Sequence, residues 1–529
     1  MVVTAFLVVF ATFLAFEYYK WLWTGYDLFE KQGIVYVKPY PIMGSLWQLL
    51  KPTATVRDFL IDVYNKYPTA TIVGIFDQSR VTYMLRNPEL AKKLAIKDFD
   101  YFTDHRQVIT EDKEPLISQN LVNLKGQKWK DMRATLSPIF TGSKMRFMFE
   151  LVSEIGAQMA EYFKQVSKNE RTVEFKETFS RFTTDVIAST SFGIKVNSLK
   201  EKKNDFYVTA DTMTNVKGFM TGIRLMILFL LPKLGKFLGL RVIAEKTTNF
   251  FVRIITHTMN VRQTLGIVRP DLIHLLLQLK KGMLKNDEIK EKLDEEDSFA
   301  AVEESEVGRV VVRRQWSENE LMAQCLIFFL AGYDTSSSVM SMLAYELATN
   351  KDVQQKLIAE INDVHETLAG SKLTYDVLQK MKYLDMVIAE GLRKWPPAEL
   401  TDRVCTKDYK LHNDDGREFI IKRGQNVWIP IIAYQMDPSC YPDPEKFNPE
   451  RFNEENKQKL DPSMYMPFGI GPRNCIGSRF ALMQMKVAFY YLLLNFTLEV
   501  CEKTQVPLKL IKGTRTQPEK GIWLELCPK

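Results

Sequence analysis

A ten-residue stretch near the C-terminus decides the fold, and it reads Phe468-Gly469-Ile470-Gly471-Pro472-Arg473-Asn474-Cys475-Ile476-Gly477. It places one cysteine in a glycine-rich loop, with an aromatic residue seven positions earlier and an apolar helical pattern directly after it. Glycine lets a backbone approach a flat ligand closely. Phe468 can shield the sulfur from water, and the N–H groups that open the following helix favour a thiolate. These features are what a cysteine thiolate ligand of a haem iron needs.

This stretch resembles the haem loop of the cytochrome P450 family, whose pattern is Phe-x-x-Gly-x-Arg-x-Cys-x-Gly. The positions that match are Phe468, Gly471, Arg473, Cys475 and Gly477. In that family the cysteine thiolate pushes electron density onto the iron and favours O–O cleavage. The structural alternative is a buried free cysteine in a Gly-Pro loop. Five matched positions in ten residues favour the haem ligand.

Residues 318–350 are expected to form one long helix, with Ser317 as its N-cap and Glu320 as the capping-box partner. Its centre reads Ala331-Gly332-Tyr333-Asp334-Thr335. Gly332 has no side chain, so the backbone there can approach a flat ligand. An adjacent acid and alcohol are costly inside an apolar helix unless they are used or paired.

Two interpretations of Asp334 and Thr335 remain open on these residues alone. The first is proton delivery, in which the Thr335 hydroxyl bonds the reacting oxygen and Asp334 relays protons through water. The second is a helix kink, in which Thr335 bonds a carbonyl one turn back. The segment resembles the family's Ala-Gly-x-Asp/Glu-Thr pattern, which favours proton delivery and implies that Ala331 and Gly332 lie against the haem.

Four further residues match family positions that bind the haem propionates. Trp129 and Arg133 form an i, i+4 pair on one predicted helical face. Alone this spacing is common, but it matches the family's Trp-x-x-x-Arg position. Arg403 matches a propionate arginine of the family, and Arg473 is expected to serve the same groups because the arginine fork suits carboxylates.

A predicted structural triad does no chemistry. Glu390 and Arg393 form Glu-x-x-Arg on a helix that stops before Pro396-Pro397. The apolar residues around the pair argue for burial, and a buried pair needs further partners. Residues 447–452 resemble the family's second arginine motif, so Arg451 is the expected third member.

Composition sets the broad class. The 529 residues carry 46% apolar residues and a net charge of +7 from interspersed charges, which does not suggest nucleic acid. The six cysteines lie far apart, so no zinc knuckle or C-x-x-C pair exists. The resemblance, which covers nearly the whole chain, implies a mainly α-helical fold with small β-sheets, the cytochrome P450 fold.

The N-terminus predicts a membrane anchor. Residues 2–16 are nearly all apolar, and Tyr18, Tyr19, Trp21 and Trp23 follow as an interfacial cluster. No basic residue precedes the run, so a cleaved signal peptide is disfavoured. We predict an anchor over residues 1–24, a linker and proline hinge over 25–44, and a haem-binding catalytic domain over 45–529. An interfacial amphipathic segment is the alternative, because 15 clean residues are short for a span.

Residues 286–318 are dense in charged side chains, including Asp294-Glu295-Glu296-Asp297. We expect a solvated, mobile loop between helices. A site for a charged partner is the alternative. A second apolar stretch, residues 225–231, is expected to be a buried helix end or a point of membrane contact.

The resemblance implies a monooxygenase with one haem b, which inserts one atom of O₂ into a small apolar substrate. Nothing in the chain binds NADPH or flavin, so electrons must come from a partner. The resemblance implies NADPH–cytochrome P450 reductase, with cytochrome b5 as a further candidate, at the endoplasmic reticulum membrane with the catalytic domain in the cytosol. Lys128, Lys130 and Arg479 are candidate docking residues.

Sequence details look most like insect microsomal members that detoxify plant toxins and insecticides. The expected substrate-facing segments are residues 103–121, 225–240, 328–335, 398–403 and 513–521. Two rival functions share the haem loop. One is a P450-type isomerase or dehydratase, which Asp334-Thr335 disfavours, and the other is a haem-binding sensor or carrier without turnover.

Overall fold

A computed structural model of the chain describes Thr12 and most residues from 25 to 529. The gaps after residue 25 are 41–42, 51–53, 79, 108–113, 169, 215–223, 225–226, 229–234, 236, 270, 281–298, 301, 303–304, 311, 313 and 512–515. The predicted anchor over residues 1–24 therefore lies outside the described residues, apart from Thr12. So does most of the apolar stretch 225–231.

The chain divides into two compact units, each described here by itself. The first contains residues 1–106, 399–434 and 511–515, and the second contains residues 107–398, 435–510 and 516–529. The second unit carries Cys475, the Asp334-Thr335 pair and every other predicted site residue except Arg403.

The first unit is built around a four-stranded sheet of order β1-β2-β7-β4, with a separate hairpin of β5 and β6. In this sheet β2 runs parallel to β7, and the other neighbouring strands are antiparallel. The strands are β1 (Ile72–Asp77), β2 (Arg80–Leu85), β4 (Thr401–Val404), β5 (Tyr409–His412), β6 (Glu418–Ile421) and β7 (Asn426–Ile429). The helices are α2 (Leu28–Lys31), η1 (Ser45–Leu50), α3 (Val56–Lys66), α4 (Pro88–Lys92), η2 (Lys93–Lys97), η3 (Phe99–Tyr101) and α18 (Ile431–Gln435), which crosses the unit boundary.

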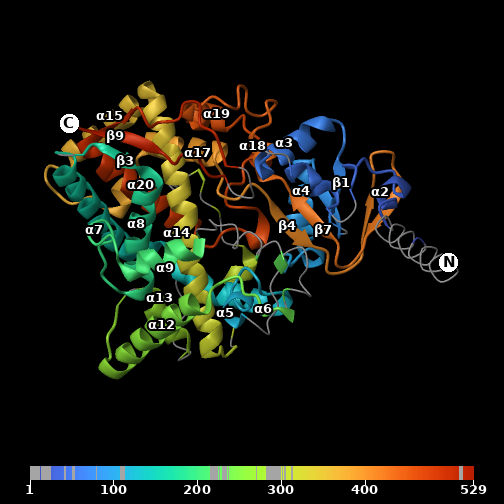
Figure 1. Cartoon of the computed structure of the whole chain (residues 1–529), viewed down its shortest axis with the longest axis horizontal. Coiled ribbons are helices and arrows are strands. Elements are labelled where there is room, and N and C mark those ends of the chain that lie inside the picture. Colours follow the sequence, from blue (N-terminus) through green and yellow to red (C-terminus); the bar gives the residue numbers. More distant parts are fainter. Residues whose placement is uncertain are drawn as a thin grey trace, which may run out of the picture. The chain divides into compact units, whose positions relative to one another are not determined.

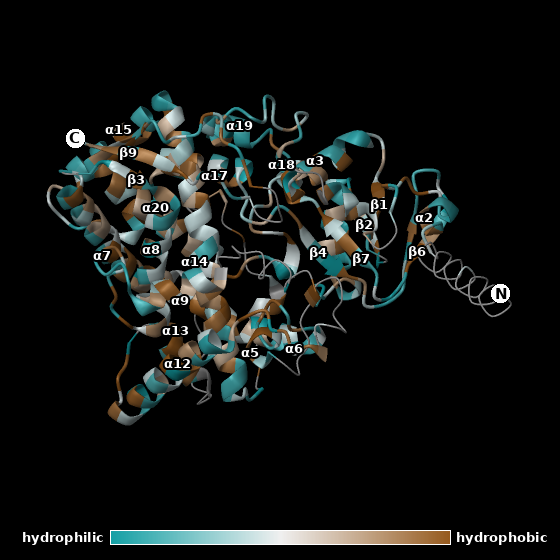
Figure 2. Ribbon diagram, in the orientation of Figure 1, coloured by the Kyte–Doolittle hydropathy of each residue, from teal (hydrophilic) through white to brown (hydrophobic). Residues whose placement is uncertain are grey.

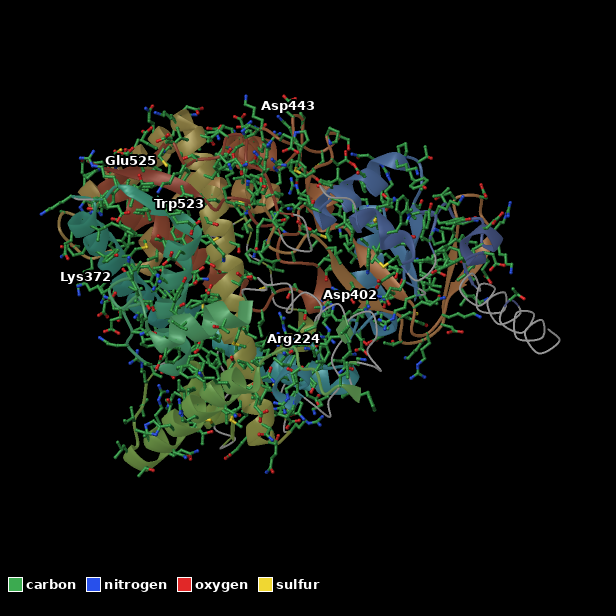
Figure 3. All side chains as sticks on the ribbon, in the orientation of Figure 1. Arg224, Lys372, Asp402, Asp443, Trp523 and Glu525 are labelled. Atoms are coloured by element: carbon green, nitrogen blue, oxygen red, sulfur yellow. The ribbon has the colours of Figure 1, made fainter. Side chains whose placement is uncertain are left out.

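The second unit is mostly helical. Its longer helices are α6 (Gly126–Leu136), α7 (Gly142–Val166), α8 (Phe175–Ile187), α9 (Asp205–Thr214), α12 (Glu245–Leu265), α13 (Leu272–Lys280), α14 (Glu318–Thr349), α15 (Lys351–Thr367), α17 (Lys382–Lys394) and α20 (Ser478–Asn495). Its short helices are α5 (Pro115–Ser118), η4 (Ser137–Phe140), η5 (Ala188–Phe192), η7 (Glu306–Arg309), α16 (Tyr375–Gln379), η8 (Pro449–Phe452), α19 (Glu454–Lys457), η9 (Pro462–Met464) and η10 (Gly471–Arg473). The strands β3 (Thr172–Glu174), β9 (Trp523–Pro528) and β8 (Phe496–Val500) pair in that order. Trp523 and Glu525 of β9 are labelled in Figure 3.

Helix α14 is the core helix of the second unit, and it begins as predicted. Ser317 accepts from the backbone of Glu320, and the Glu320 carboxylate accepts in return from the backbone of Ser317 at 2.8 Å. This capping box satisfies two N–H groups that a helix start leaves unpaired. Figure 1 shows α14 beside α8 and α20, and it packs against both. The predicted helix over residues 318–350 is confirmed.

The fold class predicted from the sequence is confirmed, because helices dominate and the sheets are small. Figure 2 shows hydrophilic and hydrophobic residues together on α7 and α15, which is typical of helices with one buried face. In the described part of the chain, α14 alone is long and apolar enough to cross a bilayer. Of its apolar stretch, 56% is buried in the protein, as expected for a core helix.

Candidate functional site

The cysteine loop runs from η10 into α20, and its glycines have the conformations that the sequence suggested. Gly469 and Gly471 adopt φ values of +78° and +72°, which other residues adopt only with strain. The backbone N–H of Cys475 donates to the carbonyl of Phe468 at 2.8 Å. The loop therefore folds back on itself and brings the two ends of the motif together.

The thiol of Cys475 is accessible although much protein surrounds it. Burial raises the pKa of this thiol, whereas a hydrogen bond from the Gly477 backbone and the charge of Arg133 act in the opposite direction. A thiolate here therefore needs a further positive partner. A bound iron is such a partner, because a coordinating thiol is deprotonated.

Arg133 holds the residue before the cysteine. Its guanidinium donates to the carbonyl of Asn474 at 2.7 Å and to the Asn474 side-chain oxygen at 2.8 Å. Arg133 is buried on α6, and this fork fixes Asn474 from two directions. The sequence prediction assigned Arg133 to a haem propionate and did not single out Asn474. The only indication of a role for Asn474 in the sequence was its position inside the cysteine motif, directly before Cys475.

Arg473 and Trp129 lie face to face in the same region. The guanidinium carbon of Arg473 is 4.0 Å from the centroid of the Trp129 ring, a cation–π contact. Arg473 also donates to the carbonyls of Leu121 at 3.3 Å and Leu124 at 2.7 Å. The structure thus brings three of the predicted propionate residues, Trp129, Arg133 and Arg473, around the cysteine loop.

Helix α14 carries two exposed residues in its middle, Ala331 and Thr335, one turn apart, among residues that are buried or half-buried. The Thr335 hydroxyl donates to the carbonyl of Ala331 at 2.6 Å, which is the bond of the kink interpretation. The hydroxyl has one hydrogen, and this bond uses it. Thr335 can therefore accept a hydrogen bond from a water or a ligand while this bond is intact, and it can donate only by breaking it.

Asp334 is paired with a lysine that sequence reasoning missed. Lys176, at the start of α8, lies 3.0 Å from the Asp334 carboxylate and 2.7 Å from the hydroxyl of Ser337. The carboxylate is 22% exposed, so it retains some contact with solvent. Lys176 matches no motif, and its role depends on how α8 packs against α14.

Gly332 has a packing reason that differs from the one expected. A Cβ atom on Gly332 would lie 2.3 Å from Cδ1 and 3.3 Å from Cγ1 of Ile187 on α8. The missing side chain therefore makes room for α8. From the sequence we expected it to make room for a flat ligand. That expectation stays a prediction, because the contact concerns one side of the residue.

Replacing Gly332 with Ala should destabilise the protein by about 1 kcal/mol, because overpacking a tight contact costs about 1–3 kcal/mol and the better helix propensity of Ala offsets about 1 kcal/mol. Adding Ile187→Val removes the Cδ1 atom that clashes and should restore most of the loss. The urea midpoints of the single and double variants measure both effects. Additive losses would mean that the contact with Ile187 is not the reason for the glycine.

The helices that carry Thr335 and follow Cys475 meet directly. Gln484 of α20 donates to the hydroxyl of Ser336 of α14, and both residues are buried. Ser336 follows Thr335, so this hydrogen bond fixes the two helices at the level of the acid-alcohol pair. Sequence reasoning missed Gln484, since it stands nine residues after Cys475 in a helix with no other polar motif.

Arg403 belongs to the first unit and is described there. It lies on β4 at 1% exposure and donates to the Thr401 hydroxyl at 3.1 Å and the Asp402 carbonyl at 2.7 Å. Burial lowers the pKa of Arg403 to about 10, and the Asp402 charge acts in the opposite direction. Asp402, labelled in Figure 3, accepts from the ring of His105 at 3.0 Å and the backbone of Arg106 at 2.6 Å.

The predicted triad of Glu390, Arg393 and Arg451 is confirmed. Arg393 donates to both carboxylate oxygens of Glu390, at 2.6 and 2.9 Å, and neither side chain is exposed. Arg451 lies 3.4 Å from the same carboxylate. Arg393 also donates to the carbonyls of Gln435 at 2.9 Å and Pro444 at 2.7 Å. These added hydrogen bonds are what a buried ion pair requires.

The residues present fit a haem. A haem-thiolate site needs an accessible sulfur, a helical face that protein does not cover, and cations for two carboxylates. Cys475 supplies the first, the accessible face of Ala331 and Thr335 the second, and the buried Arg133 and Arg473 the third. This combination in one unit is the observation on which the functional argument depends.

Comparisons with known proteins agree with this geometry. Residues 36–526 match the sequence model for cytochrome P450. Cytochrome P450 9e2 of Blattella germanica is 41% identical, over 96% of this chain and 98% of its own length. Probable cytochrome P450 9f2 of Drosophila melanogaster is 39% identical over 96% of both chains, and cytochrome P450 6k1 of Blattella germanica is 36% identical over 95% of this chain and 93% of its own.

Proposed function

The chain belongs to the cytochrome P450 family and is a monooxygenase, and we propose that it uses haem b to insert one oxygen atom into small apolar substrates, among them xenobiotics. When bound, the haem supplies the activation of O₂ and the oxidising power for oxygen transfer. The second oxygen atom leaves as water, which takes up two electrons and two protons. The protein must therefore bind the haem, admit the substrate and deliver the two protons.

Cys475 would hold the haem iron through its sulfur, and two neighbouring groups favour the thiolate form. Burial raises the pKa of the Cys475 thiol, and the Gly477 N–H and the charge of Arg133 act against that rise. The proposed role of Phe468 is to limit the approach of water. We propose that Trp129, Arg133 and Arg473 bind the propionates, and that Ala331, Gly332 and Gly477 line the ring. The buried cations near Cys475 support this assignment.

Thr335 and Asp334 are the proposed proton-delivery residues. Because the Thr335 hydroxyl donates to Ala331, its free lone pairs can accept from a water and hold that water in place. Asp334 can pass protons only if its pairing with Lys176 loosens. We propose that this carboxylate moves a proton between solvent and the water that Thr335 holds.

The proposed electron donor is NADPH–cytochrome P450 reductase, with cytochrome b5 as a second candidate and the endoplasmic reticulum membrane as the location. Redox partners and O₂ use are general in the family. Lys128 lies 2.8 Å from Glu320, the capping residue of α14, at 30% exposure. It is therefore engaged within the protein, and we keep Lys128, Lys130 and Arg479 together as the proposed docking residues.

The observation that carries the proposal is the accessible Cys475 thiol beside buried arginines. The first test is the absorption spectrum of the purified protein, reduced and treated with CO. A strongly red-shifted Soret band is expected from thiolate ligation, and a histidine-like band would overturn the proposal. Product formed with reductase under ¹⁸O₂ should carry one ¹⁸O atom. A thiolate band without turnover of any substrate would favour a sensor, and product without ¹⁸O an isomerase or dehydratase.

Replacing Thr335 with Ala should uncouple NADPH use from product formation, because the water that Thr335 holds would be lost. General acid–base groups contribute about 10²–10⁴-fold, so coupling should fall by at least about tenfold and peroxide should rise. The measurement is the ratio of product and peroxide to NADPH consumed. Intact coupling would mean that Thr335 has no part in proton delivery.

Thr349→Ala is the matched control for Thr335→Ala. Thr349 lies on the same helix and makes the same bond one turn back, to the Tyr345 carbonyl at 2.9 Å. It lies at the last turn of α14, far along the helix from the acid-alcohol pair. Its loss should leave coupling unchanged. An equal fall in both variants would assign the effect to helix geometry.

A further inference from the structure

The described part of the charged connection between α13 and α14 is not solvated throughout, which corrects the expectation for that part of residues 286–318. Residues 281–298 lie outside the described chain. After this gap, Ala300 is 3% exposed and Trp316 is 8% exposed, and Phe299 is half-buried. The described residues between 299 and 316, named here the strap, therefore contact the rest of the protein at both ends. Neither the structural triad nor the proposed chemistry explains these contacts.

The first end of the strap is anchored in an aromatic cluster. The Phe299 ring lies 5.0 Å from that of Phe452 and 5.2 Å from that of Tyr465, and these two rings are 5.1 Å apart. The Phe299 backbone N–H donates to the Asp385 carboxylate at 3.0 Å. Tyr465 stands three residues before Phe468, where the chain enters the cysteine loop. The Phe299 contact therefore fixes the strap to the chain just before that loop.

The second end is anchored on α6. The indole N–H of Trp316 donates to the Thr135 hydroxyl at 3.2 Å, and the pair is buried. Arg314 lies 3.2 Å from the Asp131 carboxylate and 5.0 Å from the Trp316 ring. Helix α6 also carries Arg133, which donates to Asn474 beside Cys475. This anchor therefore fixes the strap to the helix that holds the residue before the cysteine.

The middle of the strap bridges the two supports. Its short helix η7 packs against α6 and against η10, which is the part of the cysteine loop just before Asn474. Gly308 of η7 is buried and Val310 is 56% exposed, so one side of the strap faces the protein and the other faces solvent. The strap thus contacts the cysteine loop itself and the elements on both sides of it.

We propose that the strap is a positioning element that clamps the cysteine loop against local opening, with Phe299 and Trp316 as its positioning residues. The proposal rests on the haem-ligand role of Cys475 given above. A thiolate ligand loses strength when water protonates it or when its loop opens locally. An element fixed at both ends reduces such opening without touching the cofactor.

The test uses the full-length haem-loaded protein with Phe299→Ala and Trp316→Phe, which removes the bond to Thr135 and keeps the ring. Phe299→Leu tests rescue by a smaller apolar side chain. Phe147→Ala is the control, since Phe147 is 53% exposed on α7. One readout is the rate at which the reduced CO complex loses its red-shifted band. The other is amide hydrogen exchange of residues 466–480, with residues 351–367 of α15 as an internal reference.

The proposal predicts that Phe299→Ala speeds loss of the band and exchange of residues 466–480 by at least about tenfold, as for a local opening made about 1.4 kcal/mol easier. Trp316→Phe should have a smaller effect in the same direction, Phe299→Leu should be close to the parent, and Phe147→Ala should be unchanged. Faster exchange in α15 as well would indicate general destabilisation and overturn the proposal.

Two other outcomes distinguish the clamp from a docking role of the strap and from a failure of the haem-ligand role of Cys475. Unchanged exchange and band stability in Phe299→Ala, with a raised KM for the reductase, would make the strap a docking surface for the electron donor and overturn the clamp. A parent protein that lacks the thiolate band would refute the haem-ligand role. The exchange comparison on that protein would still report whether the strap holds the loop.

Discussion

Cys475→Ala should lose the red-shifted band of the reduced CO complex completely, and turnover should fall by at least about 10³-fold, or about 4 kcal/mol in activation free energy. Cys475 lies in the loop between η10 and α20, where Phe468, Asn474 and Gly477 already hold the backbone. The variant should therefore fold, and the loss should report the missing thiolate. Spectroscopy, haem content and product assays measure the three consequences separately.

Cys527→Ala is the control for this experiment, because Cys527 lies on β9 at the end of a strand pair and away from the loop sequence. Its spectrum and turnover should equal those of the parent. Retention of the band in Cys475→Ala would show that another residue ligates the iron, and the assignment of the cysteine loop as the haem site would then be wrong.

Arg393→Ala should lower the free energy of unfolding by about 3–5 kcal/mol, because it leaves the Glu390 carboxylate buried without its bidentate partner. Arg451 lies 3.4 Å from Glu390 and cannot replace two hydrogen bonds of 2.6 and 2.9 Å. The same change removes the donors to Gln435 and Pro444. Urea unfolding, or the unfolding rate where equilibrium is not reached, measures the loss.

Lys382→Ala is the matched control for the ion pair. Lys382 lies on the same helix and pairs with Glu454 at 2.6 Å, but both side chains are largely exposed, at 80% and 67%. Exposed pairs contribute little because water screens them. The control should therefore leave the urea midpoint nearly unchanged. An equally small effect of Arg393→Ala would show that the buried triad does not stabilise the fold.

The parts of the fold that sequence predicted are those with local causes. The α14 start follows from Ser317 and Glu320, which bond each other across three positions of the chain. The turn conformations of the cysteine loop follow from Gly469 and Gly471. The triad followed from motif spacing, and burial explains why those charges must be satisfied.

The parts that could not be predicted depend on which helix lies beside α14. Ile187 and Lys176 both come from α8, and nothing in their sequence neighbourhood says that one meets Gly332 and the other Asp334. The Thr335 hydrogen bond to Ala331 was one of two interpretations, and geometry alone could show that it forms. It coexists with an accessible side chain, so proton delivery stays a proposal.

The strap shows how a charge-rich composition can mislead. Residues 286–318 were expected to be solvated because acidic and basic residues dominate the window. Phe299 and Trp316 stand at the two ends of the strap. Their partners Phe452, Tyr465 and Thr135 lie far away in the sequence. The average composition of the stretch hides two single aromatic residues, whereas the structure shows the contacts that each of them makes.

The hydrogen bonds between Arg393 and Gln435 have a consequence for how this family can vary in length. These hydrogen bonds join the two ends of the segment between Arg393 and Gln435. Arg393 donates to the Gln435 carbonyl, 42 residues later, and the Gln435 side chain donates back to the Arg393 carbonyl at 2.9 Å. The entropy of closing a loop grows only with the logarithm of its length, about 0.6 kcal/mol for each doubling. Insertions at the exposed residues Asp415 and Gly416, at the tip of the β5–β6 hairpin, should therefore be tolerated, while the closing residues stay fixed.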